Sequence, residues 1–129
     1  MVCCVTGHRP KGFPFPRRDD NPCFLGYTIT LYETIYDLIK EGYDDFITGM
    51  ANGVDMDFAD IVLDYRNAGE YISLEAVFPC PMYHPQKLTN YMIERDIILR
   101  QCDKEVVISP HYYKGCMQKR NEYMVDKSD

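Results

Sequence analysis

The sequence predicts an α/β fold in which a single domain, residues 1–129, forms a doubly wound parallel sheet with helices on both faces. Strand-like runs alternate four times with segments of helical periodicity, no hairpin signal joins two strands, and the strand-like runs are compact and apolar. Parallel neighbours need crossover connections, so this order places helices over the sheet. Compact apolar strands are typical of a sheet that is buried on both faces.

A loop rich in proline separates the first strand from the first helix. Residues 2–5 form a short apolar run that is long enough for a buried strand. Prolines recur every few residues over 8–24, so we expect no helix in that segment. Apolar residues at helical spacing then predict a helix over about 28–41, and Gly42 stands where this helix should stop.

The middle of the chain repeats the order of strand and helix. Residues 46–48 form the second strand. In the helix that follows, Asp55 is placed to cap the amino end and Gly69 to end the helix. Residues 71–78 form the third strand, which ends at a pair of prolines around a cysteine.

The last part of the chain adds a third helix, a fourth strand and a fourth helix. Apolar residues recur at helical spacing over 88–102, and Pro85 suits the first turn of this helix. Residues 105–109 are the fourth strand, and about 114–125 the fourth helix. Because another strand should follow in this architecture, we expect the last strand or strands of the sheet to lie outside this chain.

Composition narrows the class of protein. The net charge of −6 argues against a surface that grips nucleic acid. No apolar run is long enough to span a membrane and no signal-peptide pattern is present, so we expect a cytoplasmic protein. The six cysteines include no C-x-x-C pair and the histidines are far apart, so we expect reduced, structural cysteines and no metal site.

Two β-prone runs end on Thr-Gly, and the first of these turns reads Thr6-Gly7-His8-Arg9. In open α/β sheets, ligands bind at the carboxyl ends of the strands, where we expect both turns. The first turn offers a hydroxyl, a backbone amide, an imidazole and a guanidinium that can fork onto phosphate oxygens. The alternative is an exposed arginine and a loop histidine that bind nothing.

The second turn starts at Thr48-Gly49, reaches Gly53 and enters a helix. The glycines permit close approach of a ligand to the backbone, and the first amides of the helix can receive a phosphate. Asp55 would repel a phosphate at that point, so it caps the helix or holds a ribose hydroxyl. Neither standard phosphate-binding fingerprint is present, and a connection without a ligand is the alternative.

Charged residues later in the chain have ordinary explanations. Arg120 and Asn121 lie in the last helix, where periodicity alone indicates a solvated face. Surface pairing at i,i+3 or i,i+4 accounts for Glu94, Arg95 and Asp96.

In the first loop, four basic residues close together favour a small anionic ligand over a long polyanion. They are Arg9, Lys11, Arg17 and Arg18.

The segments VTGHRP, TGMANGVDMDFAD and KRNEYMVDKSD occur in this order along the chain. Together they resemble the SLOG superfamily, the Rossmann-like group that contains DprA/Smf and LOG proteins, and within it the bacterial YpsA-like family of unknown function. The resemblance spans essentially the whole chain. It implies a Rossmann-like fold and a nucleotide or nucleotide-derived ligand at the strand ends.

The resemblance also implies roles for individual residues. Gly7, His8 and Arg9 match the first motif of the family, and Arg120 and Asn121 match the helix that precedes a glycine-containing phosphate loop. The G-x-A-x-G-x-D pattern of DprA-like members is matched by Gly49, Ala51, Gly53 and Asp55. The P-G-G-x-G-T-x-x-E signature of LOG enzymes is absent from these residues, so hydrolase activity is not assigned.

The leading hypothesis for the function is a nucleotide-binding protein that needs no further cofactor. Its partner would be a small-molecule nucleotide, such as ADP-ribose, NAD or a nucleoside phosphate. We also expect a homodimer. The ligand-binding candidates are Thr6, Gly7, His8, Arg9, Thr48, Gly49, Ala51, Gly53, Asp55, Arg120 and Asn121.

Two alternatives belong to other classes of protein. A LOG-like enzyme that hydrolyses the N-glycosidic bond of a nucleoside phosphate needs a carboxylate or base aligned with the ribose. The catalytic candidates that can be named are His8, Asp55, Glu94 and Arg120. The other alternative is a DprA-like module for single-stranded DNA or protein, although the acidic balance argues against nucleic acid.

Overall fold

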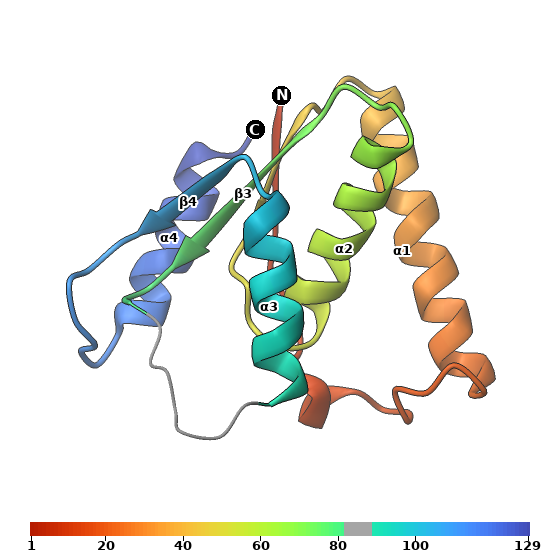
Figure 1. The fold of residues 1–129 in the computed structure, drawn as a ribbon, viewed down its shortest axis with the longest axis horizontal. Coiled ribbons are helices and arrows are strands. Elements are labelled where there is room, and N and C mark those ends of the chain that lie inside the picture. Colours follow the sequence, from red (N-terminus) through yellow and green to blue (C-terminus); the bar gives the residue numbers. More distant parts are fainter. Residues whose placement is uncertain (82–88) are drawn as a thin grey trace.

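The computed structural model describes residues 1–81 and 89–129 (Figure 1). Within these residues, four strands alternate with four α-helices, and a short 3-10 helix, Pro10–Gly12, follows the first strand. The strands are β1 (Val2–Val5), β2 (Asp45–Thr48), β3 (Ser73–Phe78) and β4 (Lys104–Val107). The helices are α1 (Pro22–Lys40), α2 (Val54–Asn67), α3 (Asn90–Gln101) and α4 (Cys116–Lys127).

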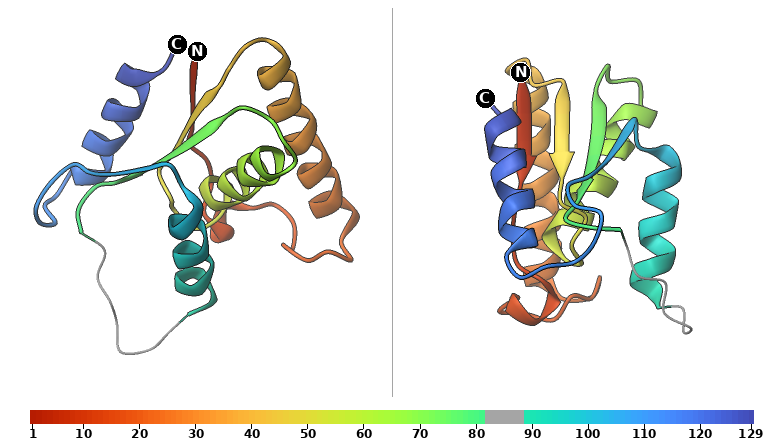
Figure 2. Two further views of the ribbon diagram at one scale, coloured as in Figure 1. Left: turned by 45° about the horizontal axis from the view of Figure 1, so that its top comes forward. Right: turned by 90° about the vertical axis from the view of Figure 1, so that its left-hand side faces the viewer.

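The strands form one parallel sheet in the order β1-β2-β3-β4. The first three helices cover one face, and α4 packs on the other face against β1 and β3 (Figures 1 and 2). The chain therefore winds in one direction as far as β4 and then turns back over the opposite face. The predicted α/β fold, with a parallel sheet and helices on both faces, is confirmed.

The sheet has an apolar cluster on each face. Phe46 and Leu74 are fully buried under the first three helices. On the other face, Ile47 and Val77 pack against Met124 of α4. Successive strand residues point to opposite faces, so a strand covered on both sides is apolar at consecutive positions. This double burial is the reason for the compact apolar runs in the sequence.

The first helix begins earlier than the sequence predicts. The prolines of the first loop argue against any helix before about residue 28, but α1 starts at Pro22. The side chain of Asn21 caps it by accepting hydrogen bonds from the amides of Cys23 (2.9 Å) and Phe24 (3.3 Å). A proline at the first helical position lacks only an amide hydrogen that has no partner within the helix.

The second helix has Gly53, not Asp55, as its N-cap. Gly53 has a φ of 106°, which L side chains rarely adopt. Asp55 is the second residue of the helix and is buried, so the prediction that it caps the helix is wrong. The helix stops predicted at Gly42 and Gly69 are confirmed, because both have positive φ angles, 102° and 109°, directly after helix ends.

The remaining boundaries differ by a few residues from those predicted. β3 begins at Ser73 and β4 at Lys104, where the sequence predicts residues 71 and 105. α3 and α4 begin at Asn90 and Cys116. The place predicted for Pro85, in the first turn of the third helix, lies outside the described residues.

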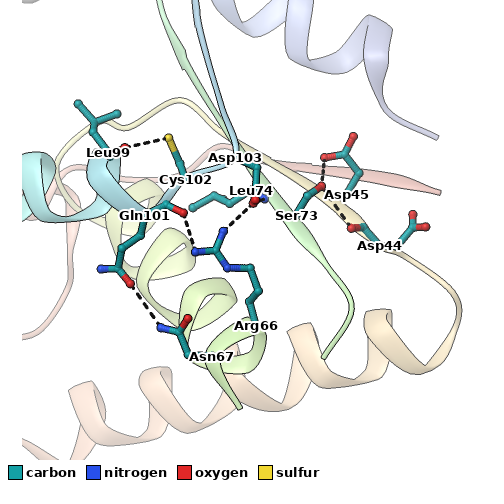
Figure 3. Close-up of polar contacts among 10 residues, drawn as sticks. All are labelled: Asp44, Asp45, Arg66, Asn67, Ser73, Leu74, Leu99, Gln101, Cys102 and Asp103. Carbon is teal, nitrogen blue, oxygen red and sulfur yellow. Dashed lines mark hydrogen bonds and ion pairs between the residues drawn. The ribbon is translucent and has the colours of Figure 1, made fainter. Parts of the chain in front are cut away.

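Side chains tie the elements together at the amino edge of the sheet (Figure 3). Arg66, near the end of α2, donates hydrogen bonds to the carboxylate of Asp103 (2.7 Å) and to the carbonyl of Gln101 (2.6 Å). The Asp103 carboxylate also accepts from the amide of Leu74 (2.9 Å). These bonds join α2, α3 and β3 at the edge opposite to the two Thr-Gly turns.

Candidate functional site

A cleft of about 320 Å³ opens at the carboxyl edge of the sheet. It lies between the first loop, the turn after β2, the end of β3 and the first turns of α3 and α4. This is the edge at which ligands bind in open α/β sheets. The lining residues are Arg9, Gly49, Met50, Ala51, Asn52, Phe78, Pro79, Tyr91, Met117 and Arg120.

The two Thr-Gly turns pack directly against each other. The amide of Val54, the first residue of α2, donates a hydrogen bond to the carbonyl of His8 (3.1 Å). A Cβ atom on Gly53 would overlap this carbonyl, and one on Gly7 would lie 2.6 Å from Cβ of Val54. Both glycines are therefore needed for the turns to meet. The contact also occupies the first amide of α2, which the sequence predicts to be open to a phosphate.

Thr48 shapes the second turn from inside. Its buried hydroxyl donates to the carbonyl of Asp55 (2.8 Å) and accepts from the amide of Met50 (3.2 Å). Met50 has a φ of 57°, a left-handed conformation that is costly for a residue other than glycine and that clusters at functional sites. Tyr91 of α3 holds this conformation by donating to the Met50 carbonyl (2.8 Å).

Arg120 reaches the cleft from α4, on the other face of the sheet. Its Nη1 donates to the carbonyl of Gly49 (2.8 Å), and its Nε donates to the side-chain oxygen of Asn121 (3.1 Å). The side chain is 7% exposed, so the solvated helix face that periodicity indicates is wrong for this residue. Burial lowers the pKa of Arg120, and the nearby Asp55 carboxylate acts in the opposite direction. The arginine stays charged, because its guanidinium is not deprotonated in proteins.

Asp55 faces Arg120 across Gly49. Its Oδ2 accepts a hydrogen bond from the amide of Ala51 (3.3 Å), whereas its Oδ1 is buried and has no partner among the described residues. Burial raises the pKa of Asp55, against the lowering effects of the Ala51 amide, of the charges on Arg120 and Arg9 and of the Gly7 amide. A buried polar atom without a partner is rare in proteins and is satisfied when a bound group donates to it.

Among the basic residues of the first loop, Arg9 lines the cleft. Its Nη2 donates to the sulfur of Met117 (3.3 Å). Arg17 is used elsewhere: it forms a two-point ion pair with Asp57 at 2.8 Å and lies over the ring of Phe13 (4.4 Å). The basic edge expected from the sequence therefore contributes one arginine to the lining.

The residues that the sequence singles out fall into three groups. Those in the lining are Arg9, Gly49, Ala51 and Arg120. Those that pack behind or beside the wall are Gly7, Thr48, Gly53, Asp55 and Asn121. Those that are exposed and outside the lining are Thr6, His8 and Glu94. The structure thus brings together the two glycine turns and Arg120, and it leaves Glu94 exposed on α3, outside the lining.

Sequence reasoning missed the apolar part of the cleft. Phe78 and Pro79 stand at the end of β3, a strand end that the sequence places at the ligand-binding edge, but neither is among the candidate residues. Tyr91 and Met117 come from the first turns of α3 and α4. Their spacing is that of core positions, so periodicity does not separate them from the core.

The sequence also predicts the wrong environment for the side chain of Arg95. Surface pairing predicts an exposed side chain, but Arg95 is only 2% exposed. Its guanidinium donates to the carboxylate of Asp96 (3.2 Å), and it lies one helical turn from Tyr91, on the same side of α3. Arg95 therefore brings a buried positive charge close to the cleft, although it is outside the lining.

A second cavity, of about 620 Å³, lies at the amino edge of the sheet beside Arg66 and Tyr71. The Arg66 charge is already paired with Asp103 (Figure 3). Within the described residues, the one buried side-chain atom without a hydrogen-bond partner belongs to Asp55, at the other edge. The smaller cleft is therefore the better candidate for a ligand site.

Neither a membrane span nor a metal centre is found in residues 1–81 and 89–129. No helix there has the length and apolar character to cross a bilayer. No three histidine, cysteine, aspartate or glutamate side chains gather there as a metal would require.

The fold and the position of the cleft define a Rossmann-like α/β domain. More specifically, the chain belongs to the YspA SLOG family, because the family model YpsA matches residues 3–129. This match confirms the resemblance to the SLOG superfamily and to its YpsA-like branch. Membership supports a nucleotide-related function without specifying the ligand. Comparison with the curated proteins gives no match.

Proposed function

We propose that this protein binds a nucleotide-derived ligand, such as ADP-ribose, NAD or a nucleoside phosphate, in the cleft at the strand ends. One observation carries the proposal. Oδ2 of Asp55 and the buried guanidinium of Arg120 flank Gly49, which has no side chain to fill the space between them. The second oxygen of this carboxylate, Oδ1, has no hydrogen-bond partner among the described residues. A ligand with a hydroxyl donor for the carboxylate and an anionic group for the arginine suits this pair. A ribose phosphate combines both groups.

The lining supports a division of the ligand into parts. Arg9 and Arg120 both border the cleft, and arginine binds phosphate oxygens through two parallel hydrogen bonds. Phe78, Tyr91 and Met117 offer an apolar and aromatic surface for a base. The arginines, rather than the amino end of α2, would hold the phosphate, since His8 already occupies the first amide of that helix.

The size of the cleft favours recognition of a mononucleotide. Its volume of about 320 Å³ lies at the lower end of the range of roughly 300–1,000 Å³ that is usual for ligand pockets. AMP, or the AMP-like half of ADP-ribose or NAD, would account for most of the contacts. We therefore expect AMP to compete with the two larger ligands.

The first experiment measures the thermal unfolding midpoint of the full chain with AMP, ADP-ribose, NAD and a short single-stranded DNA. A ligand that binds the folded state raises the midpoint by mass action. We expect a rise with each nucleotide and none with DNA. No rise with any nucleotide at about 1 mM, where even weak specific binding would register, contradicts the proposal. A rise that depends on DNA length and salt would favour the DprA-like alternative.

Substitutions connect binding to the cleft. Asp55→Asn keeps an oxygen for the Ala51 amide but removes the carboxylate, and Arg120→Lys keeps the charge but loses the planar fork. Each should weaken AMP binding by about tenfold or more, the loss of one charge-assisted hydrogen bond. Arg18→Gln is the control, because Arg18 is an exposed arginine of the first loop outside the cleft. An equal loss with Arg18→Gln would indicate unspecific attraction.

Hydrolysis of the N-glycosidic bond is the second candidate function, and the Asp55 carboxylate favours it. Burial raises the pKa of Asp55, and a carboxylate with a raised pKa is suited to take a proton from an attacking water molecule. Incubation with AMP and chromatography of the products would reveal adenine and ribose 5-phosphate. Release that Asp55→Asn abolishes would make the protein a hydrolase. Binding without release would leave it a nucleotide-binding protein.

The homodimer expected from the sequence is a further proposal. Light scattering of the purified chain measures its mass in solution, and the mass of a monomer of 15.1 kDa at micromolar concentration contradicts it.

A further inference from the structure

Two cysteines stand beside the cleft and have no part in the proposed nucleotide contacts. Cys80 follows Pro79 after the end of β3, and Cys116 is the first residue of α4, directly before Met117. Pro79 and Met117 both line the cleft. The two cysteines therefore belong to segments that form the same side of the cleft, where the end of β3 approaches the amino end of α4 (Figure 1).

The side chain of Cys116 is a direct neighbour of the Cys80 thiol and acts on it both by its charge and as a hydrogen-bonding group. Cys116 is 1% exposed, whereas Cys80 is partly exposed to solvent. Burial, and after it the neighbouring Cys116, raises the pKa of Cys80. In the reduced protein the two cysteines are thus neighbours, and Cys80 is open to small reagents from solvent.

The other four cysteines are placed differently. Cys3 and Cys4 are adjacent in β1 and pack in the clusters on opposite faces of the sheet. Cys102 directs its thiol to the carbonyl of Leu99 (3.3 Å). Cys23 is exposed on α1. Cys80 and Cys116 are the pair that joins two distant segments of the chain.

We propose that Cys80 and Cys116 form a reversible disulfide, which makes them a redox modification site at the cleft. The oxidant is a small disulfide of the glutathione class. The sulfur of Cys80 attacks it, releases one small thiol and forms a mixed disulfide. The sulfur of Cys116 then attacks the sulfur of Cys80 and releases the second small thiol. Two protein thiols are oxidised, the small disulfide is reduced, and its two thiols carry away both protons.

The bond changes the wall of the cleft. Two sulfur atoms in a disulfide are about 2.05 Å apart, closer than the sulfur atoms of two neighbouring free thiols. Closing the bond therefore draws the end of β3 and the start of α4 together, and with them Pro79 and Met117. The shape of the cleft then depends on the redox state of this pair.

The test uses the full chain with Cys23→Ser, which removes the exposed thiol. The protein is equilibrated in glutathione buffers of increasing oxidised fraction, alkylated, digested with trypsin and analysed by mass spectrometry. We expect the loss of two free thiols, a cross-link between the peptides that contain Cys80 and Cys116, and complete reversal by dithiothreitol. Adding Cys80→Ser should abolish the cross-link, and adding Cys102→Ser should leave it unchanged.

Three outcomes overturn the proposal: no oxidation of this pair in any buffer, a mixed disulfide at Cys80 that never resolves, or cross-links from Cys80 to other cysteines in place of Cys116. Formation of the same cross-link with equal yield in urea-unfolded protein would also overturn it, because the fold would then play no part. No readout involves a nucleotide, so failure here is distinct from failure of the proposed function.

Discussion

Asp55 and Arg120 lie on two sides of Gly49, and a Cβ atom at residue 49 would be 2.9 Å from Oδ2 of the aspartate and 3.0 Å from Cζ of the arginine. The two side chains come from α2 and α4, which cover opposite faces of the sheet. They meet because both helices begin near the carboxyl edge. The absence of a side chain at Gly49 leaves space between the carboxylate and the guanidinium.

Gly49→Ala should destabilise the protein and weaken AMP binding. The added methyl group would press on Asp55 and Arg120, and overpacking of this kind costs about 1–3 kcal/mol of the free energy of unfolding. Urea denaturation measures the loss. Gly26→Ala is the matched control, because no atom lies within 4 Å of its added Cβ. Gly26 lies in the second turn of α1, where alanine should stabilise by about 0.5–1 kcal/mol. If Gly49→Ala leaves the free energy of unfolding unchanged, Asp55 and Arg120 do not pack closely around residue 49.

Gly53→Ala should destabilise the protein more than Gly69→Ala does. Both glycines have φ angles that alanine rarely adopts, 106° and 109°. Only at Gly53 would the new Cβ also overlap the backbone of His8, whereas at Gly69 no atom lies within 4 Å. Urea denaturation gives the free energy of unfolding that each variant loses. The difference between the two losses therefore measures how much the packing of the two Thr-Gly turns contributes to stability. Equal losses would mean that backbone conformation alone accounts for Gly53.

Thr48→Val should cost about 1–3 kcal/mol of the free energy of unfolding, because it leaves the Met50 amide and the Asp55 carbonyl without the buried hydroxyl. Thr48→Ser keeps the hydroxyl and removes only a methyl group, so it should cost less. Denaturation of both variants gives the comparison. If valine is tolerated as well as serine, the hydroxyl does not hold the turn, and direct contact with a ligand becomes the better explanation for Thr48.

Asp60→Asn should raise the thermal midpoint more at neutral than at acidic pH. The pKa of Asp60 is raised to about 6, first by burial and then by the charges of Glu94, Asp57 and Asp64. The folded protein therefore binds a proton more readily than the unfolded chain, whose aspartates titrate near about 3.9. Stability falls as pH rises from about 4 to about 6, and this loss persists above that range.

Thermal scans of the native chain and of Asp60→Asn at about pH 4.5 and about pH 7.5 check this prediction. The gain from Asp60→Asn should be larger at the higher pH, where Asp60 of the native chain is charged. An equal change in the midpoint at both pH values would show that Asp60 has an ordinary pKa in the folded protein.

Much of the fold could be predicted because its signals are local. The apolar runs of β2 and β3 are local patterns that require burial on both faces of a sheet. Gly42 and Gly69 mark helix ends, since a positive φ after a helix favours glycine whatever the surroundings. The start of α1 was less clear, because a proline can break a helix or begin one. The contact of Asn21 with two amides decides that case.

The candidate site was harder to predict, because its residues owe their roles to contacts with distant segments. Gly49 and Gly53 stand out in the sequence, yet one borders the cleft and the other packs against the first loop. Arg120 has the spacing of a solvated helix face and is buried instead. Tyr91 lines the cleft, although nothing next to it in sequence distinguishes it from a core tyrosine.

The sequence by itself determined the α/β class, the parallel sheet, the edge that carries the polar turns and the family to which the chain belongs. These follow from periodicity, glycine positions and motifs, each of which acts over a few neighbouring residues. Only the tertiary structure decided that Asp55 faces Arg120, that His8 occupies the first amide of α2 and that Cys80 and Cys116 are neighbours. Such contacts depend on how helices on opposite faces of the sheet converge at its carboxyl edge. The pattern of neighbouring residues in the sequence does not determine the distances between these helices.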